Sequence, residues 1–156
     1  MCFTENEMFI NQIDSEVLSL HGQLGFNMPP VYPLEQIKDK EVFQFIAMQP
    51  QDQDEAVLEL LPNCRMPRWH PLFTDLIPSD SSKAVGIQSL LTHFGINKDE
   101  TMAFGDGAND IEMLQYVKYG IAMGNASPHV KRHASYVTDT ADNDGILKAL
   151  QYLNVI

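Results

Sequence analysis

From about residue 79 to the end of the chain, short apolar runs alternate with helix-like patterns. This alternation limits the possible folds more than any other feature of the sequence. The predicted strands are 101–104, 119–124 and 135–138, and the predicted helices are 79–96, 109–117, 127–134 and 142–155. Strands and helices that alternate through short links are typical of a parallel sheet with flanking helices. The sequence therefore predicts an α/β fold for this part.

The first 78 residues have a different order of elements. Segment 6–26 has apolar residues at mostly helical spacing, 41–49 is a strand-like run, and 50–62 becomes helical after a proline and several acids. Segments 64–71 and 73–78 read as two short strands, each ended by a proline. We expect a boundary between Pro78 and Lys83. Residues 1–78 would then form a smaller α+β part with an antiparallel sheet, and residues 79–156 a parallel α/β layer.

Charge and composition exclude several classes of partner. The net charge of −11 argues against nucleic acid and against an anionic membrane surface, because both repel an acidic protein. No apolar run approaches the roughly 20 residues that a membrane helix needs. Cys2 and Cys64 are far apart, fit no metal-binding spacing and follow no secretory signal. We therefore expect free thiols in a reducing compartment, and a cytoplasmic location.

The stretch "GDGAND", residues 105–110, lies between a predicted strand and a predicted helix. Ligands of open α/β sheets bind at this end of the strands. Asp106 and Asp110 are four residues apart and could face one centre, where their oxygens would suit Mg²⁺. Asn109 could donate an amide hydrogen bond to an anion beside the metal. A capped turn at the helix start is the alternative, and the spacing alone leaves both interpretations open.

Extended to "GDGANDIEML", the stretch resembles the fourth motif, GDxxNDxxML, of the haloacid dehalogenase superfamily in its Cof-type phosphatase branch. Segment 75–96 resembles the family's passage from the cap domain to the core and brings the third-motif lysine, here Lys83. Segment 119–138 resembles the next strand, helix and strand, with Met123, Gly124, Asn125 and Ala126 at the turn. Segment 142–150 resembles the last helix, so the resemblance runs from about Val42 to Leu150.

The resemblance implies a fold and a reaction. The fold would be an incomplete Rossmann-like core in residues 79–156, with residues 1–78 as the C-terminal part of an α+β cap. Enzymes of this family hydrolyse phosphate monoesters of small metabolites with Mg²⁺, through an aspartyl-phosphate. Carried over, Asp106 is the metal ligand, Asp110 supports the metal shell, and Asn109 and Lys83 hold the phosphoryl oxygens. Lys83 also screens the charge of the nucleophile.

One departure from the family pattern concerns the nucleophile. The family's first motif, DxDGT after an apolar strand, is absent, and "DNDG" at 142–145 opens a helix instead, so we interpret Asp142 as a helix cap. The chain then resembles only the C-terminal half of such a phosphatase. The alternative to a phosphatase is a catalytically inactive fragment or interaction module. The fourth-motif strand would present an unpaired apolar edge, which a second copy or the missing half could cover.

Within the first part, Arg68, Trp69 and His70 are candidates for facing a substrate across the cleft. Each also has a plainer interpretation: Trp69 as a core residue, Arg68 as a solvated strand residue, and His70 as a turn residue beside a proline.

Overall fold

The computed structural model describes residues 1–25, 27–68 and 70–156. It divides the chain into two compact units, Met1–Ser79 and Asp80–Ile156. Their boundary falls within the expected region, while the assignment of the units as cap and core remains a prediction. Among the described residues, no helix is both long and apolar enough to cross a membrane.

The first unit is built on an antiparallel sheet in the order β2-β1-β3-β5-β4. Its strands are β1 (Cys2–Phe3), β2 (Met8–Phe9), β3 (Gln44–Met48), β4 (Cys64–Arg65) and β5 (Phe73–Pro78). Helices α1 (Ser15–Leu24) and α2 (Asp54–Leu60) accompany them, with 3₁₀ turns η1 (Leu34–Gln36) and η2 (Gln51–Gln53). Its buried apolar residues include Phe9, Ile10, Val17, Leu20 and Phe73. The unit is therefore α+β, as expected.

Two predictions for this unit were wrong. The helix predicted over 6–26 begins only at Ser15, because Asp14 caps it by accepting hydrogen bonds from the backbone N–H groups of Glu16 and Val17. Upstream of that cap, Phe9 is fully buried in β2, which pairs with β1. Among the described residues of the strand predicted over 64–71, β4 takes up only Cys64 and Arg65, and residues 66–68 after it are irregular.

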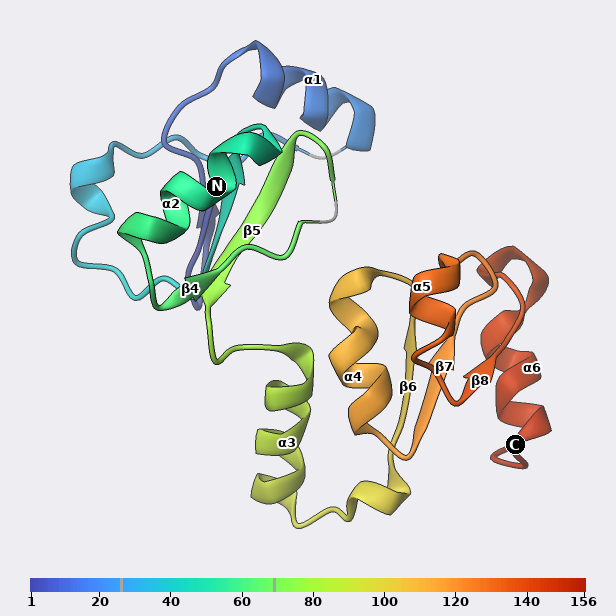
Figure 1. Cartoon of the computed structure of the whole chain (residues 1–156). Helices are drawn as coiled ribbons and strands as arrows, with labels where there is room; N and C mark the ends of the chain where they lie inside the picture. Colours follow the sequence, from blue (N-terminus) through green and yellow to red (C-terminus); the bar gives the residue numbers. More distant parts are fainter. Residues whose placement is uncertain (26, 69) are drawn as a thin grey trace. The chain divides into compact units, whose positions relative to one another are not determined.

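The second unit has a parallel sheet in the order β6-β7-β8, with strands β6 (Met102–Gly105), β7 (Tyr119–Ala122) and β8 (Tyr136–Val137). Its helices are α3 (Lys83–Phe94), α4 (Ile111–Tyr116), α5 (Pro128–Lys131) and α6 (Gly145–Tyr152), with 3₁₀ turns η3 (Lys98–Glu100), η4 (Ala108–Asp110) and η5 (Ala141–Asn143). Helix α4 packs along β6 and β7, and α3 packs against α4 (Figure 1). Leu114, Ala122, Ala126 and Val130 form its buried cluster. This is the predicted α/β arrangement.

Local signals explain where these helices begin and end. Ser82 caps α3 by accepting a hydrogen bond from the N–H of Val85, and Gly95 ends the helix at φ 65°. Pro128 occupies the first turn of α5, where its missing N–H costs nothing.

The interpretation of Asp142 as a helix cap was wrong. Asp142 lies inside η5, and Asp144 precedes α6 in a left-handed conformation without a side-chain cap hydrogen bond. Asp139 organises this turn instead, because its carboxylate accepts from Thr140, Asn143 and Lys148.

Candidate functional site

The loop after β6 folds back on the Asp110 carboxylate. Oδ2 of Asp110 accepts hydrogen bonds from the backbone N–H groups of Asp106 and Gly107, each at 3.0 Å. Gly105 makes room for this, because a Cβ there would lie 2.6 Å from Cβ of Asp110. Asp110 is only 5% exposed. Its carboxylate therefore holds the loop in shape, which is part of what the capped-turn interpretation expected.

Lys83, the first residue of α3, donates a hydrogen bond to Oδ1 of Asp110 and forms an ion pair with it. Burial of Asp110 opposes its ionisation. The hydrogen bonds from Lys83, Gly107 and Asp106 outweigh burial and hold the pKa of this carboxyl below its usual value. Asp110 is thus an anion with both oxygens occupied, and it anchors Lys83 at the loop.

Asp106 lies at the carboxyl end of β6 with its side chain exposed. Its Oδ2 accepts a hydrogen bond from the side-chain amide of Asn125 at 2.8 Å. Within the described part of the chain, Oδ1 of Asp106 has no hydrogen-bond partner. Asp106 therefore presents a carboxylate oxygen to a ligand, whereas Asp110 does not.

Asn125 belongs to the turn after β7 and was not among the predicted site residues. A signal for it did exist. Parallel neighbouring strands end at the same edge of a sheet, so the residues just after β6 and just after β7 are expected to meet. The side-chain amide of Asn125, in the turn after β7, was therefore a candidate partner for Asp106, in the loop after β6.

Asn109 sits on η4, exposed, with Oδ1 only 2.5 Å from where a Cβ on Gly107 would be. Its side chain makes no hydrogen bond within the described residues. The structure thus brings Lys83, Asp106 and Asp110 together and leaves Asn109 beside them.

The donor set is suited to part of a magnesium site. Carboxylate oxygen is the ligand that Mg²⁺ prefers, and Oδ1 of Asp106 offers one. The described residues hold no group of three or more His, Cys, Asp or Glu that could hold a metal ion. Asp106 fits the role of one protein ligand, and any further anionic ligand would have to come from elsewhere.

Arg68 in the first unit is fully engaged. Its Nε and Nη2 donate to the Asp54 carboxylate, its Nη2 also donates to the Gln49 carbonyl, and its Nη1 donates to the carbonyls of His70 and Pro71. A guanidinium has five N–H donors, and these contacts use all of them. The interpretation of Arg68 as a solvated strand residue was wrong, because it fastens the loop after β4 to the start of α2.

The predictions for the two residues that follow Arg68 have different outcomes. His70 stacks on Phe73 with ring centroids 4.5 Å apart, and its Nδ1 accepts a hydrogen bond from the N–H of Leu72. These are the contacts expected of a turn residue. Trp69 lies outside the described residues.

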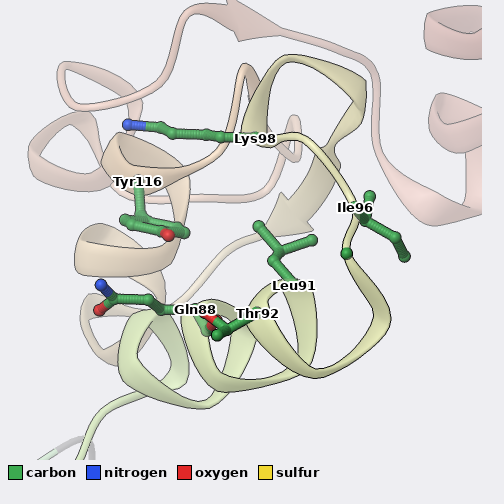
Figure 2. Close-up of a pocket in the computed structure, with 7 residues that line it drawn as sticks. Gln88, Leu91, Thr92, Ile96, Lys98 and Tyr116 are labelled. Carbon is green, nitrogen blue, oxygen red and sulfur yellow. The ribbon is translucent and has the colours of Figure 1, made fainter.

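A pocket of about 350 Å³ opens between α3, η3 and α4. Figure 2 shows side chains of α3 and Tyr116 of α4 around it; the lining residues are Gln88, Leu91, Thr92, Gly95, Ile96, Lys98 and Tyr116. The Lys98 ammonium lies 4.8 Å from the centre of the Tyr116 ring. Neither Lys83 nor residues 105–110 are among the lining residues, so this pocket is separate from the Asp110 loop.

Comparison with known proteins identifies the family. Residues 1–150 match the family of haloacid dehalogenase-like hydrolases. The chain belongs to this family. The Cof-type branch, also called subclass IIB, is supported as well. A solved sugar phosphatase of subclass IIB is 36% identical, with a TM-score of 0.88 over 99% of this chain and 60% of that one.

Two curated proteins of Bacillus subtilis strain 168 are also similar. YkrA is 41% identical over 117 residues, which is 75% of this chain and 45% of YkrA. The 5-amino-6-(5-phospho-D-ribitylamino)uracil phosphatase YitU is 39% identical over 83 residues, or 53% of this chain and 30% of YitU. The chain thus spans less than two thirds of the length of each of these relatives.

Proposed function

We propose that this chain carries the lysine–aspartate part of a phosphatase site that hydrolyses phosphate monoesters of small metabolites. The observation that supports the proposal is the convergence of Lys83, Asp106 and Asn125 on one loop at the carboxyl ends of β6 and β7. Phosphoryl transfer depends mostly on positioning and on neutralising charge. A cation from α3 and an outward carboxylate oxygen are groups that serve those two needs.

We propose Mg²⁺ as the cofactor, with Asp106 as the ligand from this chain. When bound, Mg²⁺ neutralises charge on the phosphoryl oxygens. Asp110 would keep Asp106 in place by accepting the hydrogen bond from its backbone N–H. Through its ion pair, Asp110 would also hold the Lys83 ammonium at the loop, where the ammonium would contact the phosphate. Asn109 is exposed beside this loop and would add an amide donor to a phosphoryl oxygen.

The nucleophilic aspartate of the family would come from outside these 156 residues. Asp142 does not replace it, because it lies in η5 rather than after a buried strand. Without a nucleophile, binding the phosphate in its ground state does not lower the chemical barrier. We expect this chain alone to be inactive as a phosphatase.

A complementation experiment tests the proposal. Hydrolysis of p-nitrophenyl phosphate with Mg²⁺ is measured for this chain alone and for the chain mixed with the N-terminal portion of the similar sugar phosphatase. Turnover is expected only in the mixture, and Asp106→Asn and Lys83→Ala should each remove it. Turnover by the chain alone that Asp142→Asn abolishes would contradict the proposal. Phosphorylated sugars and sugar alcohols are the first substrates to test, because two of the similar proteins are a sugar phosphatase and a phosphatase of a phosphoribityl compound.

The second candidate function is an interaction module that is not itself catalytic. Its support is a pair of exposed apolar side chains on one face of α3, where Leu90 and Phe94, four residues apart, are 57% and 65% exposed. In the same unit, β6 pairs with β7 alone among the described strands. An unpaired edge and an apolar helix together suit a strand-bearing partner.

We propose that this partner is the remaining part of a haloacid dehalogenase core, with a second copy of the chain as the competing occupant. Light scattering of the chain separates them. A monomer that forms a one-to-one complex with the sugar-phosphatase portion supports the remaining part of the core as the partner. A homodimer that Phe94→Glu disrupts supports a second copy of the chain as the partner. Leu60→Glu, at an exposed leucine outside α3, is the control and should leave that homodimer intact.

We also propose a reducing, cytoplasmic setting. Cys2 and Cys64 are both free, and burial raises the pKa of the Cys2 thiol, which keeps it protonated and unreactive. Mass spectrometry after thiol alkylation in cells should find both cysteines reduced.

A further inference from the structure

We infer that Asn125 is a positioning residue that orients the Asp106 carboxylate, so that Oδ2 is held by protein and Oδ1 is left for a cation. The inference rests on the proposed function, because it concerns the metal ligand named there. Its direct observation is the hydrogen bond from the Asn125 amide to Oδ2 of Asp106, at 2.8 Å. The two residues are 19 positions apart and belong to different loops.

The backbone on the Asp106 side is fixed independently of Asn125. The N–H of Asp106 donates to Asp110, which Lys83 in turn holds. The last residue of β6, Gly105, pairs with Ala122 of β7, and its carbonyl accepts from the N–H of Met123 at 2.9 Å. The start of the loop after β6 is therefore tied to the turn that carries Asn125.

The turn on the Asn125 side is equally constrained. The N–H of Gly124 donates to the Asp139 carbonyl at 3.0 Å, and the Lys131 ammonium donates to the Gly124 carbonyl at 2.6 Å. A Cβ on Gly124 would lie 2.7 Å from the backbone of Asp139, so only glycine fits there. The N–H of Ala126 closes the turn onto the Met123 carbonyl.

The chemistry of the pair favours orientation rather than stability. Both side chains are exposed, and an exposed amide–carboxylate hydrogen bond contributes little to folding. The hydrogen bond from Asn125 does restrict the rotation of the Asp106 carboxylate. Ligating carboxylates are commonly held by a hydrogen bond of this kind, and the loss of such a partner typically costs 10–100-fold in metal affinity. An amide donor also neutralises no charge, so Asp106 keeps its full negative charge for a cation.

Titration calorimetry of the chain with Mg²⁺ tests the inference. Asn125→Ala should weaken Mg²⁺ binding by about tenfold, within the range expected for such a partner. Asn143→Ala is the matched control, because it removes the equivalent amide–carboxylate hydrogen bond to Asp139 outside the site. That variant should bind Mg²⁺ like the unsubstituted chain. Both variants should unfold at the same temperature as the parent.

The outcomes separate this inference from the proposed function. If Asp106→Asn loses Mg²⁺ binding while Asn125→Ala keeps the Mg²⁺ affinity of the unsubstituted chain, the inference is overturned and the proposed metal ligand stands. Binding that survives Asp106→Asn overturns both. No saturable binding by the unsubstituted chain overturns the inference alone, because Oδ1 would then hold no cation, whereas the proposed function is tested by turnover in the mixture. A metal-free readout comes from NMR: Asp106→Ala should move the side-chain amide resonances of Asn125. Unmoved resonances would show that the hydrogen bond is absent in solution.

Discussion

The Lys83 ammonium and Oδ1 of Asp110 form an ion pair that joins the first residue of α3 to the loop after β6. The same carboxylate accepts two backbone N–H groups through Oδ2. One buried anion therefore fixes both the lysine and the loop that bears Asp106. The geometry of the candidate site depends more on Asp110 than on any other single side chain.

Asp110→Asn should destabilise the second unit. The asparagine side chain keeps the shape of aspartate but loses the negative charge that pairs with Lys83. Its NH₂ group must also face a hydrogen-bond donor, either the Lys83 ammonium or the N–H groups of Asp106 and Gly107. The expected loss in the free energy of unfolding is about 1–3 kcal/mol, measured by urea unfolding. Asp142→Asn, on the exposed turn η5, is the control and should change little. Equal stabilities for the two variants would argue against this role of Asp110.

Much of the fold could be predicted because its signals are local. Ser82 and Gly95 delimit α3, and Pro128 starts α5, within the predicted helix ranges 79–96 and 127–134. The N-terminal strands could not be predicted in this way, since β1 and β2 have two residues each and exist only through pairing with each other and with β3. Asp14, which separates β2 from α1, was overlooked within a helical apolar pattern.

The site residues that lie close together in the sequence could be predicted. Contacts that the fold makes between distant residues could not. Asp106 and Asp110 stand in one short motif. The Asn125–Asp106 hydrogen bond links two loops across a pair of parallel strands. Arg68 was misread for the same reason, because its partner Asp54 is 14 residues away and on another element.

Stability should depend on pH through Asp139. Hydrogen bonds from Lys148, Thr140 and Asn143 lower the pKa of this carboxyl to about 2. An unfolded aspartate titrates near 4, so the unfolded state takes up the proton first, and stability falls as the pH drops from about 4 towards 2. Urea unfolding of the parent and of Asp139→Asn across this range should show a stability difference above pH 4. The difference should shrink towards pH 2, and one that stays constant would contradict the assignment.

Arg68→Lys should destabilise the first unit although the charge is kept. A lysine has three N–H donors on one atom and cannot reach the five acceptor contacts that the guanidinium makes. The expected loss is about 1–3 kcal/mol in the free energy of unfolding, because carbonyls and a carboxylate lose their donors. Arg132→Lys, on the exposed end of α5, is the matched control and should be near neutral. A neutral result for Arg68→Lys would mean that water replaces these contacts.

Gly105→Ala should disturb the candidate site by crowding rather than by backbone strain. The added Cβ would lie 2.6 Å from Cβ of Asp110 and 2.9 Å from its Oδ2, so the carboxylate must move away from the loop N–H groups. Overpacking of this kind costs about 1–3 kcal/mol, and displacement of Asp110 should also shift the backbone amide resonances of Asp106 and Gly107. Gly86→Ala is the control: nothing lies within 4 Å of its Cβ position in α3. Alanine is the better helix former by about 1 kcal/mol, so this variant should be more stable than the parent. A stable Gly105→Ala variant with unchanged amide resonances would show that the Asp110 loop tolerates a side chain at this position.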